Sequence, residues 1–449
     1  MLESVYRVIE DNQEMYLAWL QELCRQPSVA AQNRGMQETA RLVEHFLAAT
    51  GAKVERLATP GYPVVYGELD CKKPKTLSFY NHYDVQPEDP LELWESSPFA
   101  ADIRGGRLFA RGAADNKGNL MARIAAVHAY KEVHGALPVN VKFIVEGEEE
   151  IGSPHLEAFA ERYPAKVRAD GCIWEFGYKN PDGRLQVSLG VKGMCYVELR
   201  AKGANTDLHS ANAAVIQNPA WRLVWALGTL KNEREEVLIE GFYDRVLPPD
   251  DEERALLREM IYEEAAVLAD LGLERFLLGL SGESLRERLV FGPTCTICGV
   301  VSGYTGEGSK TVLPSVAKAK LDFRLVPDQD PADVLKLLRR HLDAHGFKDI
   351  EIIDLTGERP AKTAIGDPLV GAVVRSARRV YGKPPTINRI SPGTGPMYAL
   401  CQRYGVPAVS VGVGHSRSQN HAPNENIYLQ DYNDGIKMIA TVLYEFARS

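Results

Sequence analysis

Strand-like and helix-like runs alternate over the first 188 residues, and this alternation limits the folds open to the chain more than any other feature. The runs "KTLSFYNH" at 75–82 and "NVKFIVEG" at 140–147 have the length and the β-branched and aromatic content of buried strands. Between them, residues 118–133 have the apolar spacing of a helix. Strand–helix–strand units predict an α/β domain with a mostly parallel sheet and helices on both faces.

A different pattern occupies residues 189–360. Its runs follow the order strand, helix, strand, strand, helix, strand, which is the order of a ferredoxin-like α/β sandwich. A charged, helix-rich stretch at about 231–290 interrupts this order, and the first pattern resumes near residue 361. A chain of 449 residues is also long for a single domain. We therefore expect one domain from 1–188 and 361–449, with a second domain inserted at 189–360.

Composition narrows the partners of the chain. Hydrophobic residues make up 45%, charged residues make up 25%, and the net charge is -8, which argues against a basic surface for nucleic acid or anionic membranes. Residues 1–29 carry acidic side chains and fit an amphipathic helix better than a secretory signal. No stretch reaches the roughly 20 apolar residues of a membrane span. Seven scattered cysteines do not suggest a disulfide framework, so we expect a cytoplasmic protein.

Polar side chains cluster where predicted strands end. His82 and Asp84 are two apart on an extended segment, so both side chains point the same way and the carboxylate can orient the imidazole. Asp115 lies in a Gly-bounded loop directly before a predicted helix. Taken singly, a His-x-Asp pair is weak evidence of a site, and Asp115 fits a helix N-cap equally well. In parallel sheets, however, ligands gather at the carboxyl ends of strands.

The segment "VEGEEEIGS" at 145–153 places four glutamates within five positions at such a strand end. An isolated acidic run is usually a solvated loop. If these carboxylates are buried, their pKa values rise unless a cation neutralises them. Glu175 follows another short apolar run, and His415 and His421 lie in a polar loop near the C-terminus. Histidine and carboxylate ligands of this kind suit zinc, manganese or cobalt.

The order and spacing of several motifs resemble those of the M20 metallopeptidases, which include carnosinase-like dipeptidases, glutamate carboxypeptidase, and acylase and desuccinylase relatives. The resemblance covers nearly the whole chain. It is carried by "NHYDVQP", "RGAADNKG", "EGEEEIGS", "DLHSA", "KTVLPSVAKAKLDFRLVP" and "HAPNE". Each motif is weak alone, but their order along one chain is specific.

The resemblance implies a centre of two divalent metal ions, with zinc as the expected ion and manganese or cobalt as alternatives. Asp115 matches the carboxylate that bridges the two ions, and the peptide bond after it is often cis in this family. Asp84 matches the partner that orients a ligand histidine, and Glu149 matches the general base that takes a proton from metal-activated water. The implied metal ligands are His82, Asp115, Glu150, Glu175 and His421.

The inserted domain resembles the lid and dimerisation module of the same family. His209 matches a histidine that reaches into the active site of the partner subunit to stabilise the oxyanion. Arg324 matches an arginine that binds the substrate carboxylate, a role suited to a planar guanidinium group. Thr311 and Thr394 match substrate contacts, although relatives carry "GGS" where this chain has "PGTG" around Thr394. The resemblance therefore implies a homodimer formed through the lid.

The resulting hypothesis is a dinuclear metallohydrolase that cleaves the amide bond of dipeptides or small peptides. The alternative is an N-acyl-amino-acid deacylase with the same metal centre, and a non-catalytic binding protein on this fold would be expected to have lost ligands. The "NHYDVQP" form and the helical insert favour the dipeptidase branch. Glu146, Glu148 and His415 receive no role, and solvated or supporting positions are expected for the two glutamates.

Overall fold

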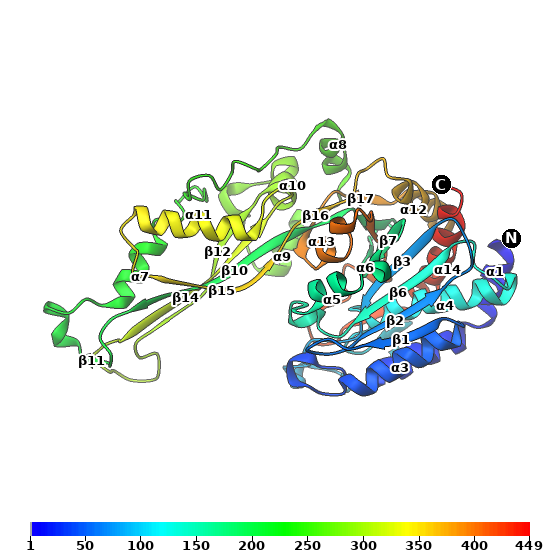
Figure 1. Ribbon diagram of the computed structural model, residues 1–449, viewed down its shortest axis with the longest axis horizontal. Helices are drawn as coiled ribbons and strands as arrows, with labels where there is room; N and C mark the ends of the chain where they lie inside the picture. The colour runs from blue at the N-terminus through cyan, green and yellow to red at the C-terminus, as the bar shows by residue number, and fades with distance from the viewer. Residues whose placement is uncertain (1) are drawn as a thin grey trace.

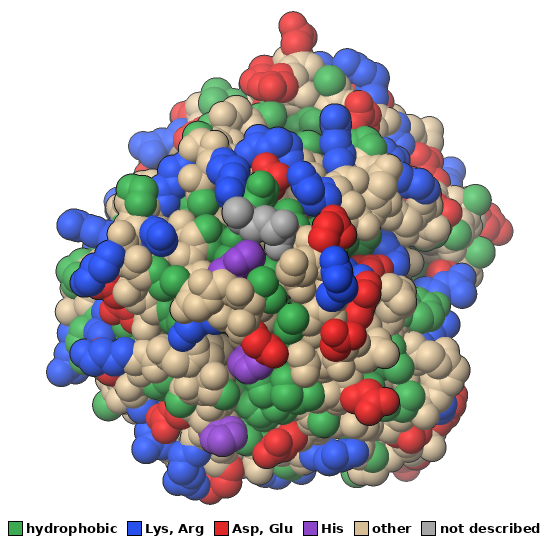
Figure 2. Space-filling view, turned by 90° about the vertical axis from the view of Figure 1, so that its right-hand side faces the viewer, with side chains coloured by type: hydrophobic (Ala, Val, Ile, Leu, Met, Phe, Trp, Pro, Cys, Tyr) green, Lys and Arg blue, Asp and Glu red, His purple; other side chains and the backbone are tan. Residues whose placement is uncertain are grey.

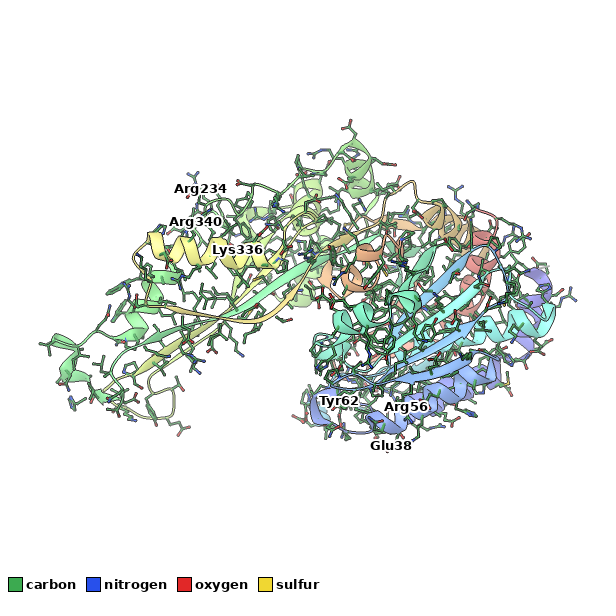
Figure 3. The ribbon with its side chains drawn as sticks, in the orientation of Figure 1. Glu38, Arg56, Tyr62, Arg234, Lys336 and Arg340 are labelled. Carbon is green, nitrogen blue, oxygen red and sulfur yellow. The ribbon has the colours of Figure 1, made fainter. Side chains whose placement is uncertain are left out.

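A computed structural model describes residues 2–449. The molecule is elongated, with a larger body that contains both termini and a smaller body built on a second sheet (Figure 1). Arg56 and Tyr62 lie on the larger body, whereas Lys336 and Arg340 lie on the smaller one (Figure 3). The two bodies are joined by long strands, so the chain runs from the larger body into the smaller one and back.

The larger body is organised around a ten-stranded sheet. Its four central strands, in the order β6, β3, β7 and β19, are parallel, whereas β1 and β2 add an antiparallel edge. The strands are β1 (Lys53–Leu57), β2 (Val64–Leu69), β6 (Asn140–Glu146), β3 (Thr76–His82), β7 (Gly171–Trp174), β19 (Ala408–Ser410), β9 (Leu185–Ser188), β8 (Tyr178–Lys179), β20 (Gly414–His415) and β17 (Thr386–Asn388). The mixed α/β fold with a parallel centre is the one that the sequence predicts.

Helices cover both faces of this sheet. One face packs against α1 (Leu2–Asp11), α2 (Gln13–Arg25), α3 (Met36–Ala49), α4 (Lys117–His134), α12 (Pro368–Tyr381) and α14 (Leu429–Phe446). The other face packs against α5 (Leu156–Arg162), α6 (Pro164–Val167) and α13 (Met397–Leu400). Alternate residues of one strand enter the two cores, as Phe79 and Tyr80 of β3 do. The expected single N-terminal helix is in fact two helices, because the first ends at Asp11.

The smaller body contains an antiparallel sheet with the strand order β12, β14, β10, β15. Side chains from this sheet and from two helices form a separate hydrophobic core. These elements are β10 (Gly190–Lys202), α7 (Pro219–Leu227), β12 (Thr294–Ser302), β14 (Val316–Leu325), α11 (Pro331–Ala344) and β15 (Glu351–Glu358). The strands and helices therefore occur in the order expected from the sequence.

The charged stretch between α7 and β12 forms three short helices, α8 (Asp251–Glu259), α9 (Glu264–Leu271) and α10 (Gly282–Phe291). Leu257 and Phe291 of this stretch pack against Ile390, which follows β17 of the larger body. The guanidinium Nε of Arg389 donates to Glu253 Oε1 at 2.7 Å, and both side chains are mostly buried. The insert is therefore attached to both bodies.

The surface of the larger body carries charges of both signs. Figure 2 shows lysine and arginine interspersed with aspartate and glutamate on the end of the molecule opposite the smaller body. All seven cysteines are free thiols. Among residues 2–449, no helix combines the length and the apolar character that crossing a lipid bilayer would require.

Candidate metal centre

The parallel strands of the larger body place polar side chains at one edge of the sheet. His82 is the last residue of β3, Glu146 is the last residue of β6, and Glu175 directly follows β7. The register aligns His82 with Glu146 across β3 and β6. Because these strands run in the same direction, their carboxyl ends meet at one edge, as the sequence pattern predicts.

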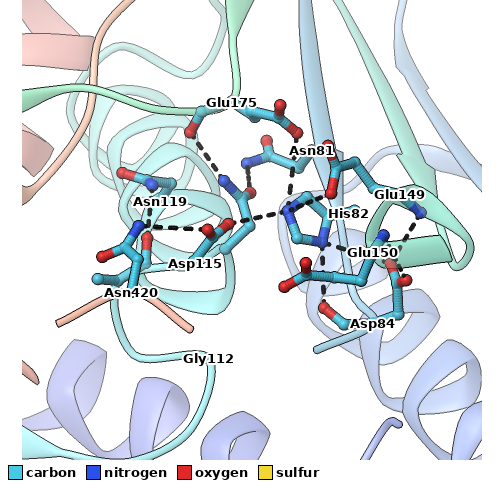
Figure 4. Close-up of polar contacts among 12 residues, drawn as sticks. Asn81, His82, Asp84, Gly112, Asp115, Asn119, Glu149, Glu150, Glu175 and Asn420 are labelled. Carbon is cyan, nitrogen blue, oxygen red and sulfur yellow. Dashed lines mark hydrogen bonds and ion pairs between the residues drawn. The ribbon is translucent and has the colours of Figure 1, made fainter. Parts of the chain in front are cut away.

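His82 lies at the centre of this cluster and is fully buried (Figure 4). Its Nδ1 lies 3.0 Å from the backbone carbonyl of Asp84 and 3.3 Å from the Asp84 Oδ1 atom. A carbonyl only accepts hydrogen bonds, so the proton is on Nδ1 and Nε2 is left as a ligand atom. Nε2 lies 3.1 Å from Asp115 Oδ1 and 3.7 Å from Glu175 Oε2.

Asp84 connects this histidine to the acidic segment. Its two carboxylate oxygens accept hydrogen bonds from the backbone N–H groups of Glu149 and Glu150, at 3.3 and 3.0 Å. Asp84 is fully buried, and its partners come from two different strand ends. Its carboxylate therefore fixes the position of both glutamates relative to His82.

Asp115 lies between two histidines. Its Oδ1 faces His82, and its Oδ2 lies 3.3 Å from His421 Nε2 and accepts a hydrogen bond from Asn420 at 3.2 Å. His421 Nε2 also lies 3.2 Å from Glu150 Oε2. The peptide bond between Asp115 and Asn116 is cis, as the resemblance implies.

These side chains have the donor chemistry of a metal site. His82, Asp115 and Glu150 each offer one ligand atom, and the three atoms lie within 4.8 Å of one another. Two carboxylate oxygens of the cluster, Glu150 Oε1 and Glu175 Oε2, are buried without a hydrogen-bond partner. A buried carboxylate oxygen without a partner is costly, and a coordinated cation removes that cost. The residues therefore fit a divalent cation.

The electrostatics of the cluster agree with this fit. Burial raises the pKa of Glu175 to about 8, and burial together with the charge of Glu175 raises the pKa of Glu149 well above its ordinary value. Hydrogen bonds to Asp115 and Glu150 raise the pKa of His421 to about 10. Several carboxylates thus share a volume in which their charges repel one another, and positive charge stabilises them there.

Glu425 supports the Asp115 loop, a role that the sequence analysis missed. Its Oε1 accepts hydrogen bonds from the backbone N–H groups of Ala114 and Asp115, both at 2.9 Å. Its Oε2 accepts from the backbone N–H of Gly112 and from Arg111 Nη1, at 2.9 and 2.8 Å. Glu425 is the last residue of the "HAPNE" motif, so its place in the motif was the available signal.

The two glutamates without an assigned role are buried, so of the two positions expected for them, solvated or supporting, the supporting one agrees with the structure. Glu146 Oε1 accepts hydrogen bonds from the hydroxyls of Tyr80, at 2.5 Å, and Ser153, at 2.9 Å. Glu148 Oε2 lies 2.8 Å from His155 Nδ1. These contacts hold the acidic segment against the neighbouring strand β3, through Tyr80, and against the turn before α5, through Ser153 and His155.

The remaining candidates are not all close to this cluster. Arg324 Nη1 donates to Thr394 Oγ1 at 2.8 Å, which connects β14 to β18 (Ser391–Thr394). His209 lies in β11 (Leu208–His209), and the carbonyl of Thr311 accepts from the neighbouring N–H of Ser210 at 3.1 Å. β11 is at the end of the smaller body farthest from the larger sheet (Figure 1). His415 is buried in the larger body, with Nε2 3.1 Å from Asn426 Oδ1.

Comparison with known proteins places the chain among peptidases. Human Beta-Ala-His dipeptidase is 29% identical over 474 residues, which cover 100% of this chain and 93% of the human protein. The Cys-Gly metallodipeptidase dug1 of Schizosaccharomyces pombe is 28% identical, over 99% of this chain and 98% of that protein. The structure of the M20 family metallo-carboxypeptidase Sso-CP2 from Sulfolobus solfataricus superposes with a TM-score of 0.93 at 42% identity, and covers 97% of this chain and 99% of that one.

The model of one peptidase family matches residues 78–445, a range that contains every candidate ligand named above. Together with the cluster of histidine and carboxylate groups, this match shows that the chain belongs to peptidase family M20/M25/M40 and is a hydrolase of peptide bonds.

Proposed function

We propose that this protein is a metal-dependent dipeptidase, which cleaves dipeptides and other short peptides at the cluster around His82. The observation that carries the proposal is the convergence of six side chains from five separate segments on one strand-end edge. Relatives that align along the whole chain are named Beta-Ala-His dipeptidase and Cys-Gly metallodipeptidase, which favours dipeptides as substrates.

Two divalent ions, zinc in the first instance, fit the ligand set. His82 and Glu175 would hold one ion, Glu150 and His421 would hold the other, and Asp115 would contact both through its two oxygens. The contacts of Asp115 Oδ1 with His82 and of Oδ2 with His421 support this division. When bound, the ions would supply Lewis-acid activation of a water molecule and of the scissile carbonyl.

Glu149 is the proposed general base. Its Oε2 lies 3.9 Å from His82 Nε2, and its side chain remains partly exposed at 19%. Glu149 would accept a proton from the attacking water and return it to the amine of the leaving residue. Its backbone N–H is fixed by Asp84, which also holds Nδ1 of His82, so Asp84 orients both the base and a ligand.

Residues 189–360 are proposed to form a lid and dimerisation domain inserted between 1–188 and 361–449. Trp221 and Trp225 of α7 stack with ring centroids 6.0 Å apart, yet they are 58% and 54% exposed. The edge strand β12 also exposes Val300 and Val301. Exposed apolar surface on a sheet edge and an adjacent helix is typical of a subunit interface. We infer a homodimer through this surface.

The candidate substrate contacts divide into two groups. Arg324 and Thr394 are hydrogen bonded to each other and would bind the substrate carboxylate from the same chain. His209 and Thr311 lie beyond reach of their own metal centre, at the far end of the smaller body, and would serve the centre of the partner subunit. His209 would then donate to the oxyanion that forms during attack on the carbonyl.

The alternative N-acyl-amino-acid deacylase uses the same chemistry, but the dipeptidase names of full-length relatives do not favour it. Sso-CP2 is named a metallo-carboxypeptidase. The release of a C-terminal residue from longer peptides is therefore another candidate activity. Both peptide activities need a free substrate carboxylate beside Arg324. Assays with Gly-Leu, a tripeptide and N-acetyl-leucine separate the three activities. A cytoplasmic location remains a prediction.

The test of the metal centre is metal analysis of the wild-type protein and of Glu149→Gln. We expect two divalent ions per chain in both proteins, and a loss of kcat on the order of 100- to 10,000-fold in the variant, because only the base is removed. Glu157→Gln is the control, since this glutamate is exposed and lies outside the cluster. Full turnover by Glu149→Gln would refute Glu149 as the base, and a chain that holds no ion would refute the metal centre.

A further inference from the structure

Apart from the metal centre, a cavity of about 370 Å³ lies between the helical insert and the sheet of the smaller body. Its wall comes from α10 and the loop before it, from the starts of β10 and β12, and from the end of β14. Arg324 is the only one of its residues with a role in the proposed chemistry so far.

One side of this cavity is apolar. The side chains of Phe276, Leu280, Leu285 and Leu289 face it, all from the segment that includes α10. Leu285 is buried, whereas Phe276 and Leu280 are half-buried. An apolar wall of this size, with few polar groups, is typical of a pocket for a small ligand.

The other side is cationic. Lys192, Lys231, Arg288 and Arg324 line the cavity, and Glu235 is its only acidic lining residue. Lys192 is 3% exposed, and its Nζ donates to the backbone carbonyl of Gly292 at 2.6 Å. Burial, and then the charges of Arg324 and Arg288, lower the pKa of Lys192 to about 8. An anionic group beside these side chains would offset their repulsion.

A short segment connects this cavity to the metal centre. Pro392 lines the cavity, and Thr394 accepts the hydrogen bond from Arg324. Thr394 is also the register partner of Lys192 between β18 and β10. A Cβ atom at Gly395 would lie 3.6 Å from Glu175 Oε1. The three steps from Pro392 to Gly395 span roughly 10 Å at most in extended backbone, so the cavity lies within about that distance of the residue that borders Glu175.

We propose that this cavity binds the C-terminal residue of the substrate, with its carboxylate at Arg324 and Lys192 and a large apolar side chain against Leu280 and Leu289. The inference deepens the proposed function and rests on it for the identity of the substrate. An acidic side chain is not expected, because Arg288 already donates to the carbonyl of Glu235 and Lys231 is paired with the Glu235 carboxylate. Leu280 and Leu289 therefore offer the surface that the side chain of the C-terminal substrate residue would contact.

The first test compares kcat/KM for Gly-Leu, Gly-Gly and Gly-Glu. We expect Gly-Leu to be preferred over Gly-Gly by tenfold or more, the order that an added apolar group contributes in a pocket. Leu280→Gln should lower this preference severalfold. Leu271→Gln should leave it unchanged, because Leu271 lies on the same insert but is 64% exposed and outside the cavity.

Equal rates for Gly-Leu and Gly-Gly, a preference for Gly-Glu, or an equal effect of the two leucine variants would each overturn the inference.

The second test does not depend on hydrolysis. Calorimetry of the zinc-loaded wild-type protein should detect L-leucine binding at least tenfold more tightly than glycine, and Leu280→Gln should remove this difference. If no peptide is cleaved but the difference is found, the cavity assignment stands and the proposed function fails. If peptides are cleaved and leucine binds no better than glycine, the proposed function stands and the cavity assignment fails.

Discussion

At the scale of single residues, the site depends on carboxylates that do not themselves face the cluster. Glu425 is fully buried and receives hydrogen bonds from three backbone N–H groups of the Asp115 loop and from Arg111. It therefore sets the path of the loop that presents Asp115 to both histidines. His421, four residues earlier, has a φ of 60°, a left-handed conformation that is uncommon for a residue with a side chain. Such backbone persists where the surrounding structure fixes it.

We predict that Glu425→Gln weakens metal binding by roughly 10- to 100-fold and lowers the free energy of unfolding by about 3 kcal/mol. The amide keeps the size of the side chain but leaves the buried guanidinium of Arg111 without its counter-charge. Competition titration with a zinc chelator and thermal unfolding measure the two effects. Glu95→Gln is the control, because that side chain is 73% exposed in its ion pair with Arg104. Unchanged zinc affinity in Glu425→Gln would contradict the role given to Glu425.

At the scale of elements, Glu253 shows how one side chain can both start a helix and attach it. It forms a capping box with Asp250 at the N-terminus of α8, and its other oxygen pairs with Arg389 of the larger body. The helical insert, which lines the cavity beside Arg324, is thus attached to the larger body by a buried ion pair at the start of α8. The sequence predicts a charged, helix-rich stretch here, but the partner of Glu253 lies 136 residues away.

A second element-scale feature is the end of β15, where the chain returns to the larger body. Glu358 lies beside a cavity of about 480 Å³ that is lined by both bodies. Burial, and then the charge of Glu157, raises the pKa of Glu358 to about 7 from its ordinary 4.5. Between these two pH values the folded chain holds a proton that the unfolded chain has lost. The free energy of unfolding therefore falls as pH rises from about 4.5 to about 7.

We predict that Glu358→Gln removes this pH dependence. The melting temperature of the variant should match the wild type near pH 4 and exceed it by about 1 °C at pH 8, for a gain of about 1 kcal/mol after allowance for partial exposure. Thermal unfolding of both proteins across this pH range measures it. Glu351→Gln, at the exposed start of β15, should show no such trend. A constant difference between Glu358→Gln and wild type at all pH values would contradict the prediction.

At the scale of the whole molecule, the elongated shape separates two groups of predicted site residues. The cluster around His82 is complete within one chain, whereas His209 lies at the opposite end of the smaller body (Figure 1). If His209 acts in catalysis, it must act on another copy of the chain. This geometry allows a test for which the residues of the subunit interface need not be known.

We predict that Glu149→Gln and His209→Ala, each nearly inactive alone, restore activity when mixed and allowed to exchange subunits. In the mixed dimer one centre receives an intact Glu149 from one chain and an intact His209 from the other. About a quarter of wild-type activity is expected at equal mixing, because half of the dimers are mixed and each carries one intact centre. Light scattering should report a dimer. Mixtures as inactive as the separate variants would exclude the exchange of His209 between subunits.

Much of the fold and of the site could be predicted from sequence because both follow local rules. The alternation of strands and helices predicts the parallel centre of the larger sheet, and the strand ends mark His82, the glutamates at 146–150 and Glu175 as candidates. The choice of Glu149 and Glu150 within that run came from the family resemblance. The short strand β1 and the break between α1 and α2 were missed, since neither has a strong apolar pattern or a clear turn signal. For Glu146 the sequence left a solvated and a supporting position open, because a charged run gives no indication of what covers it.

The sequence by itself determined which histidine and carboxylate side chains stand at the ends of the parallel strands, because the carboxyl ends of parallel strands meet at one edge of the sheet. Only the tertiary structure decided that Glu425 supports the Asp115 loop from 310 residues away, that Thr394 pairs with Arg324, and that the insert closes a cavity beside them. The physical reason is that these contacts depend on register and packing between distant segments, which no local periodicity encodes.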